Sequence, residues 1–252
     1  LVTRNSPSQR RASRHLGRVA NLNIDGPKAY TTVDKALSPD NTLGIQMRIS
    51  RKTMKQSGAA LEQAVRRDMN GAISQEVDRV VFQGTGADGQ PLGLFTGAAT
   101  YGIEQTAIDA AASWSAFRAA VVEFMTANAA AGPDAVKLLL RPEVWASLDD
   151  ALISGTAVSE WDRLVKNIPA GNISMTSNAL AAPSGDPLAS SAILTTNSGG
   201  VAPFFVGLWG AVDLIRDPYA DAASGGLRLT ALSTMDVTVA RGVQSRILTG
   251  IQ

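Results

Sequence analysis

The sequence contains no cysteine and only one histidine, His15. The lack of cysteine excludes disulfides, thiolate metal sites and thiol nucleophiles. Because His15 lies in an arginine-rich segment without apolar periodicity, neither a Ser-His-Asp triad nor a multi-histidine metal site is expected. No apolar run reaches membrane-spanning length, and no signal peptide is visible. We therefore predict no catalytic residues, no metal, no cofactor and no membrane partner.

The 252 residues, 45% of them hydrophobic, suffice for one large domain or two modest ones. The net charge is only +1, but it is unevenly distributed. Through Ser57, eleven lysines and arginines face three aspartates, whereas the rest of the chain carries twelve basic residues against nineteen acidic ones. Two interpretations remain open: a solvated basic tail, or a basic segment that attracts the acidic body of the same or a neighbouring subunit.

The stretch from Ser57 to Gly84 has the strongest periodicity in the chain. Its apolar residues recur three and four positions apart, at Leu61, Ala64, Val65, Met69, Ala72, Ile73, Val77, Val80 and Val81. Ser57 is a suitable N-cap, and Gly84 is suited to the position after the last turn. The predicted helix is about 37 Å long. A single apolar stripe of that length needs other chain segments packed along it.

Residues 1–23 are rich in arginine, serine, asparagine and proline, which predicts an extended arm that orders only against a partner. A hairpin pattern follows: Tyr30–Val33 has strand composition, Ser38–Asn41 has turn chemistry, and Leu43–Ile49 alternates apolar and other residues. A two-stranded ribbon alone is marginal in water. We expect this one to lie on the body at its base and on another subunit at its tip.

The sequence GTGADGQPLG after the long helix matches the pattern G-x-G-x-x-G. A dinucleotide site needs a strand before these glycines and a helix opening within them, whereas here a helix precedes them. The favoured interpretation is a structural turn that reverses the chain, and a nucleotide-binding enzyme that uses Gly84–Gly89 is the alternative from a different class. The turn residues are Gly84, Gly86, Gly89, Pro91 and Gly93.

The middle of the chain alternates helical and strand patterns, typical of a compact mixed subdomain. Trp114–Ala130 is predicted to be a helix with Ser113 as its cap, and Val136–Leu140 a strand covered on both faces. Another helix begins at Arg141-Pro142-Glu143. Its expected inward residues are Val144, Trp145, Leu148 and Leu152, and the adjacent carboxylates Asp149 and Asp150 are expected on a solvated face.

The last hundred residues contain no further helical pattern. Ser154–Gly200 is expected to form loops with brief strands at Ile173–Met175 and Ala192–Thr195. Phe204–Arg216 has strand composition, Asp217-Pro218 ends it, and Tyr219–Gly226 is a polar turn. Two further strand patterns follow, one at 227–231 and one from 237 to 248. We expect these C-terminal strands to form the sheet that packs along the long helix.

Three passages together carry a family resemblance. The first, Ile49–Ser57, leads from a strand into the long helix, and the second, Glu76–Gly93, contains the helix end and the glycine-rich turn. The third runs from Gly207-Leu208-Trp209-Gly210 to Asp217-Pro218, then through Leu227-Arg228-Leu229 and Asp236-Val237-Thr238-Val239-Ala240. On these passages the chain from Tyr30 onward resembles the major capsid proteins of tailed bacteriophages with the Hong Kong 97-like fold. The match is weakest between residues 154 and 200.

The resemblance implies an α+β, Hong Kong 97-like fold with four parts. They are an N-terminal arm (1–24), an extended β-hairpin loop (25–48), a peripheral domain (49–112 and 204–252) with a spine helix at 58–83, and an axial domain (113–203). Family members commonly lose an N-terminal scaffolding segment to a maturation protease. A chain that starts at Leu1 is expected to be such a product or a trimmed one.

The implied function is that of a non-enzymatic subunit that self-assembles, through hexamers and pentamers, into an icosahedral shell around double-stranded DNA. The implied partners are other copies of the chain, a portal protein at one vertex, packaged DNA bound without sequence specificity and, as an option, a decoration protein. Assembly would occur in the host cytoplasm, and the mature location would be the virion. The alternative with the same fold is an encapsulin-type compartment that encloses a cargo enzyme.

The expected contacts between subunits involve the basic arm and hairpin, at Arg10, Arg11, Arg14, Arg18, Lys28 and Lys35. The arm arginines can meet either the acidic body of a neighbour or DNA phosphates. The arm lacks aromatic residues for base stacking, which favours subunit contacts for most of them.

We predict that the subunits are not covalently joined. One family member links neighbours by a lysine–asparagine isopeptide bond with the help of a glutamate, and Lys28 or Lys35 could supply the amine. However, no asparagine follows Asn197 and no glutamate follows Glu160, so the C-terminal strands offer no acceptor. Denaturing gel electrophoresis of purified material should give one band at the monomer mass, and a ladder of linked subunits would contradict this expectation.

Overall fold

A computed structural model describes residues 37–197 and 200–252 of the chain. The described residues belong to one unit, Ala36–Gln252. The arm and the first strand of the predicted hairpin, Tyr30–Val33, lie outside them. The strands are β1 (Asn41–Ile49), β2 (Glu104–Ala110), β3 (Val136–Leu140), β4 (Ile173–Met175), β5 (Ser190–Thr196), β6 (Phe204–Asp217), β7 (Leu227–Val239) and β8 (Ser245–Ile251). The α-helices are α2 (Arg51–Gln83), α3 (Ala98–Tyr101), α4 (Trp114–Thr126), α5 (Pro142–Asp150) and α6 (Glu160–Asn167).

Helix α2 is longer than the sequence predicts. The predicted start at Ser57, and with it the range 58–83, is wrong, because the helix begins at Arg51 and spans 33 residues, about 50 Å at 1.5 Å per residue. Ser50 is the N-cap: its backbone is extended, and its hydroxyl oxygen accepts a hydrogen bond from the backbone N–H of Thr53 at 3.2 Å. A glycine at 58 costs only about 1 kcal/mol, too little to stop a helix capped upstream.

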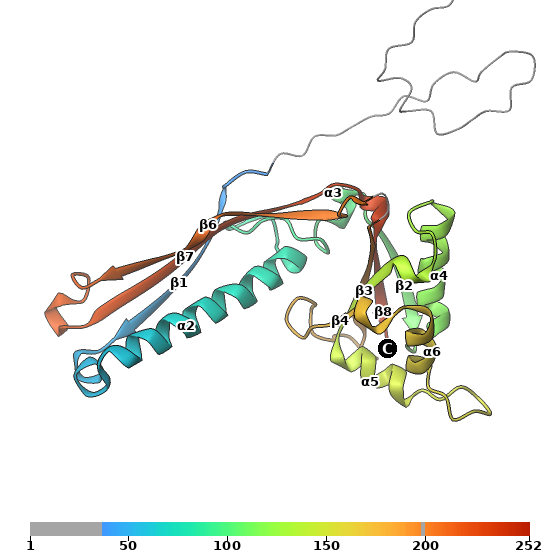
Figure 1. The fold of residues 1–252 in the computed structure, drawn as a ribbon, viewed down its shortest axis with the longest axis horizontal. Helices are drawn as coiled ribbons and strands as arrows, with labels where there is room; N and C mark the ends of the chain where they lie inside the picture. Colours follow the sequence, from blue (N-terminus) through green and yellow to red (C-terminus); the bar gives the residue numbers. More distant parts are fainter. Residues whose placement is uncertain (1–36, 198–199) are drawn as a thin grey trace, which may run out of the picture. The chain divides into compact units, whose positions relative to one another are not determined.

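The apolar stripe of α2 is covered by a three-stranded antiparallel sheet with the order β1-β7-β6. Figure 1 shows α2 running alongside these strands. Val65, Met69 and Ile73 of the helix form one buried cluster with residues of β1 and β7, including Ile49 and Leu229. The predicted packing of C-terminal strands along the helix is therefore confirmed for β6 and β7, although residues 227–239 form one continuous strand instead of belonging to two.

The second sheet has five strands in the order β2-β8-β5-β3-β4. β8 runs parallel to β2 and antiparallel to β5, and β3 is antiparallel to β5 and parallel to β4. The prediction that residues 245–248 join the sheet along α2 is wrong. β8 is a central strand with both faces buried, because Ile247 packs in the cluster with Val80 and Val81 while Leu248 packs on the other side with α4.

Helices α4, α5 and α6 bury their apolar residues against the second sheet, in a cluster that includes Phe117, Phe124, Leu148 and Leu164. The prediction of loops at Ser154–Gly200 missed α6. This helix begins with a capping box, in which the Ser159 hydroxyl accepts from the N–H of Asp162 and the Asp162 carboxylate accepts from the N–H of Ser159.

Other predictions for this region need smaller corrections. Helix α4 ends at Thr126 rather than at 130, and its first N–H, that of Trp114, donates to the Glu160 carboxylate at 2.8 Å instead of being capped by Ser113. Of the expected inward residues, Val144 and Leu148 are buried, but Trp145 and Leu152 are exposed. β3 is fully buried on one face, whereas on the other Leu139 is half-buried against the cluster with Val80 and the side chain of Lys137 is exposed. Asp149 and Asp150 are exposed, as predicted.

We predict that Met69→Ala lowers the free energy of unfolding by about 2–5 kcal/mol, the range for truncating a fully buried methionine. Met69 is 1% exposed in the cluster that joins α2 to the sheet. Urea denaturation followed by circular dichroism measures the change. The matched control is Met125→Ala in α4, because Met125 is 43% exposed. Equal effects of the two substitutions would contradict a core centred on α2.

Candidate functional site

The basic residues expected to contact neighbouring subunits lie outside the described residues, so their role stays a prediction. They are Arg10, Arg11, Arg14, Arg18, Lys28 and Lys35. The structure does describe the glycine-rich turn, an exposed apolar strand and a hairpin end with a network of charged residues. These three features are therefore the candidates for a functional site.

The glycine-rich turn folds back on the end of α2. The N–H of Gly84 donates to the Val80 carbonyl at 2.8 Å, and the N–H of Gly93 donates to the Gly84 carbonyl at 2.9 Å. Gly86 and Gly89 have φ angles of 73° and 74°, which favour glycine. Between them the chain reverses and returns alongside the helix end.

Close packing explains the other glycines of this turn. A Cβ atom on Gly84 would overlap the carbonyl oxygen of Pro91, and one on Gly93 would overlap the backbone nitrogen of Gly84. After the turn, the N–H groups of Leu94 and Phe95 donate to carbonyl oxygens in the last turn of α2, at 3.0 and 2.9 Å. Carbonyl groups that a helix end leaves unpaired are thus satisfied by the chain that follows.

Tyr101 ties this turn to the first sheet. Its hydroxyl donates to the Leu92 carbonyl at 2.8 Å and lies 3.3 Å from the Val237 carbonyl of β7. Burial, followed by the nearby charge of Asp236, raises the pKa of Tyr101. The phenol is therefore neutral at physiological pH and available as a donor.

The described residues do not form a nucleotide site at the glycines. Helix α2, not a strand, precedes them, and the next helix, α3, begins only at Ala98. The alternative of a nucleotide-binding enzyme is therefore wrong in its structural premise. Within residues 37–197 and 200–252, no group of three or more His, Asp or Glu side chains is arranged to hold a metal ion. No helix in this part of the chain is long and apolar enough to span a membrane.

Strand β6 forms one edge of the first sheet and exposes large apolar side chains. The exposed residues are Phe205, Val206, Leu208, Trp209 and Ile215, with Leu208 56% accessible. Its register against β7 shifts between Trp209 and Asp213, where Gly210 has a φ of 80°. An apolar edge strand with free backbone groups is a surface that proteins usually cover by a partner.

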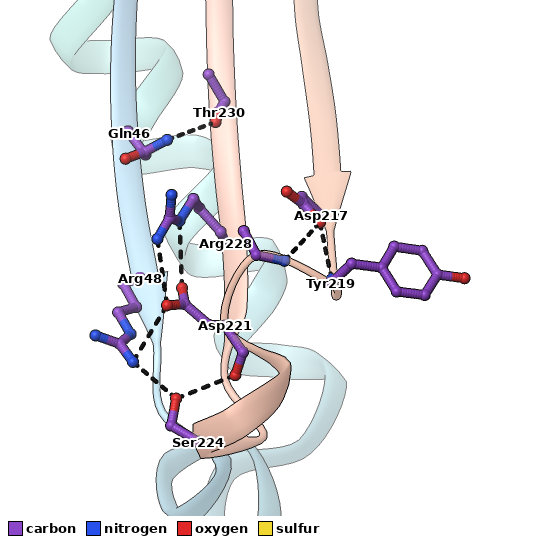
Figure 2. Close-up of polar contacts among 9 residues, drawn as sticks. Gln46, Arg48, Asp217, Tyr219, Asp221, Ser224, Arg228 and Thr230 are labelled. Carbon is purple, nitrogen blue, oxygen red and sulfur yellow. Dashed lines mark hydrogen bonds and ion pairs between the residues drawn. The ribbon is translucent and has the colours of Figure 1, made fainter.

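The end of the β6–β7 hairpin contains a network of charged residues (Figure 2). The Asp221 carboxylate, 7% exposed, accepts from the Arg48 guanidinium of β1 and from the Arg228 guanidinium of β7, each at 3.2 Å. Arg48 also donates to the Ser224 hydroxyl at 2.7 Å. The Asp221 carbonyl accepts from the N–H groups of Ser224 and Gly226. This network joins β1 to the end of the β6–β7 hairpin, where Ser224 lies 176 residues after Arg48 in the sequence.

A second set of bonds fixes the start of the same turn. The Asp217 carboxylate accepts from the N–H groups of Tyr219 and Ala220, at 2.8 and 3.1 Å, and these bonds hold the pKa of Asp217 below its usual value. The Tyr219 side chain, in contrast, is 85% exposed and points away from the network (Figure 2). Sequence reasoning described Tyr219–Gly226 only as a polar turn. The signal in the sequence for the charged network was Asp221, which lies between Asp217-Pro218 and Arg228.

Sequence comparisons place the chain among phage proteins. It matches the phage capsid family over residues 17–242. The major capsid protein of Halomonas phage phiHAP-1 is 27% identical over 227 residues, which cover 87% of this chain and 34% of that protein. The chain thus spans about a third of the length of this relative.

Solved structures show the same fold. The capsid of a native GTA particle has a TM-score of 0.60 at 13% identity, covering 84% of this chain and 73% of that one. The virus-like particle from Pyrococcus furiosus has a TM-score of 0.58 at 13% identity, covering 86% of this chain and 79% of that one. The capsid of Myoviridae phage XM1 has a TM-score of 0.56 at 17% identity, covering 83% of this chain and 73% of that one. With the predicted α+β, Hong Kong 97-like fold confirmed and the family matched over most of the sequence, the chain belongs to the phage capsid family.

Proposed function

We propose that the chain is a structural subunit that self-assembles into an icosahedral shell, built from hexamers and pentamers, around double-stranded DNA. The observation that carries this proposal is the exposed apolar edge of β6 in a member of the phage capsid family. Among the described residues, the large apolar side chains of this edge stay exposed to water. Assembly removes the apolar area from water at roughly 25 cal/mol per Å².

The mechanism rests on many weak contacts rather than on one strong one. Head-to-tail contacts between identical copies close into rings when the rotation closes, and rings can tile a shell. Each subunit is then held by several neighbours, so that no single contact needs high affinity. The basic arm and hairpin, from Arg10 to Lys35, would lie over the neighbouring subunit and add ionic contacts to the apolar ones.

The further partners follow from the same proposal. A shell that receives DNA needs a portal protein at one vertex, and a decoration protein is an optional addition. The subunits would assemble in the host cytoplasm and remain in the virion. Most of the arm arginines would contact neighbouring subunits, and the rest would contact DNA phosphates without sequence specificity.

The encapsulin-type compartment is the second candidate, because the fold alone does not separate a viral capsid from a virus-like particle. The specific observation that favours the virus is the sequence relative, a major capsid protein of a Halomonas phage. The contents of the particle distinguish the two candidates: double-stranded DNA in the first, a cargo enzyme in the second.

The proposal predicts closed particles that protect DNA from nuclease. Purified particles should appear as icosahedral shells by electron cryomicroscopy, and DNA extracted after nuclease treatment should be double-stranded. A protein that stays monomeric at all concentrations and salt conditions tested would refute the shell. Shells that hold a protein cargo and no DNA would favour the compartment.

We further predict that Leu208→Lys prevents assembly without unfolding the subunit. Leu208 lies on the exposed edge strand, so lysine there leaves the subunit core intact but places a charge where a neighbour would pack. Light scattering should show no particles at the concentration at which the unaltered protein assembles, and the melting temperature should be nearly unchanged. Leu188→Lys, at a leucine that is 67% exposed outside the two sheets, is the matched control. Normal assembly of Leu208→Lys would show that β6 faces no neighbour.

A further inference from the structure

The end of the β6–β7 hairpin carries an aromatic side chain, Tyr219, that lies outside the buried clusters of the described residues. We define the hairpin tip as residues 217–228 with Arg48 and the first turns of α2. Within it, Tyr219 is 85% exposed, the most exposed of the large hydrophobic side chains in the described residues. An exposed tyrosine on a flexible loop is unremarkable, but this one stands on a turn fixed by two carboxylates, Asp217 and Asp221.

Because the backbone of this turn is already fixed, binding would cost less conformational entropy. The Asp217 carboxylate accepts from the backbone N–H groups of Tyr219 and Ala220, and Asp221 is held by arginines from β1 and β7. Only the two side-chain torsions of Tyr219 remain to be ordered on binding. Rigidly presented tyrosines are among the residues that contribute most to protein interfaces.

The surroundings of Tyr219 carry excess positive charge. Within the tip itself, Arg48 and Arg228 are balanced by the carboxylates of Asp221 and Asp217, so the excess comes from the start of α2. The start of α2 adjoins this network, because a Cβ atom on Gly225 would come within 2.9 Å of the Arg51 Cδ. Arg51, Lys52 and Lys55 are exposed, are spaced to share one helix face, and form no ion pair with any described residue.

The body of the chain between the start of α2 and the hairpin tip carries the opposite charge. Residues 56–215 contain sixteen aspartates and glutamates against eight lysines and arginines. A cationic tip and an acidic body on one chain are complementary between two copies, in a head-to-body contact that can be repeated around a ring. DNA would accept the cations equally well, but the bases inside a duplex are stacked and offer no surface for a protruding tyrosine.

We infer that the hairpin tip is a preformed docking site for a second copy of the chain, with Tyr219 as its anchor and the cations of α2 directing it to an acidic surface. This inference rests on the proposed shell function and names the part of the subunit that makes one of its contacts. Tyr219 supplies buried area, and the cations supply orientation and association rate.

The aromatic part is tested by Tyr219→Ala and its matched variant Tyr219→Phe. Tyr219→Ala should raise the lowest protein concentration that gives particles at least about tenfold, the effect of losing one interface anchor. Tyr219→Phe keeps the ring and should assemble within about threefold of the unaltered protein. The melting temperature of the unassembled subunit should be nearly the same for both, since the side chain is 85% exposed.

The charge part is tested by the double variant Lys52→Glu/Lys55→Glu. Acidic residues at a helix start are favourable, so the unassembled subunit should melt at the same or a higher temperature than the unaltered protein. Its assembly should nevertheless be weakened, and the dependence of assembly on salt concentration should be smaller. Stability and assembly therefore move in different directions, which a purely structural role of these lysines would not produce.

Several results would overturn the inference while leaving the proposed function standing. Assembly of both variants at the unaltered concentration shows that the tip contacts no neighbour. Particles that form normally but contain less DNA show that the tip faces the packaged DNA instead. If the unaltered protein forms no particles at all, the proposed function itself fails, and the inference with it.

Discussion

The apolar stripe of α2 is the constraint on which the described fold depends. A helix of 33 residues with one apolar face cannot be shielded by neighbouring residues in sequence. It is covered by a strand that precedes it and by one that follows much later: Ile45 of β1 lies opposite Ala231 of β7, and both strands pack on Met69 and its neighbours. The cover is therefore complete only after β7 has been made.

The end of α2 connects the two sheets. Val80 and Val81 lie in one buried cluster with Val237 of β7 and with Ile193 and Ile247 of the second sheet. The glycine-rich turn follows directly, and its close backbone contacts leave no room for a Cβ at Gly84 or Gly93. A turn that resembles a phosphate loop in sequence thus serves to direct the chain from the first sheet to the second.

Local signals in the sequence predicted more of the elements than long-range ones did, although the start of α2 and the capping box of α6 were missed. The period of α2, the end of that helix and the strand Val136–Leu140 were all predicted, because each depends on neighbouring residues. The place of β8 was missed, since its burial on both faces depends on α2 and α4 together. The Trp114 N–H is capped by Glu160, a partner that only the fold brings near. The glycine-rich turn was visible in sequence for the same local reason, whereas the hairpin tip required Arg48 from another strand.

The subunit separates the residues that hold its fold from those available for contacts. The clusters around α2 and α4 bury large apolar side chains such as Met69, Phe117 and Phe124, and none of the exposed apolar side chains of β6 belongs to them. A monomer would gain solubility by replacing Phe205 or Leu208 with charged residues, as edge strands commonly do. That these residues remain apolar is explained if the edge spends most of its time against another copy. The same reasoning applies to Tyr219, which is held by polar bonds to its backbone alone.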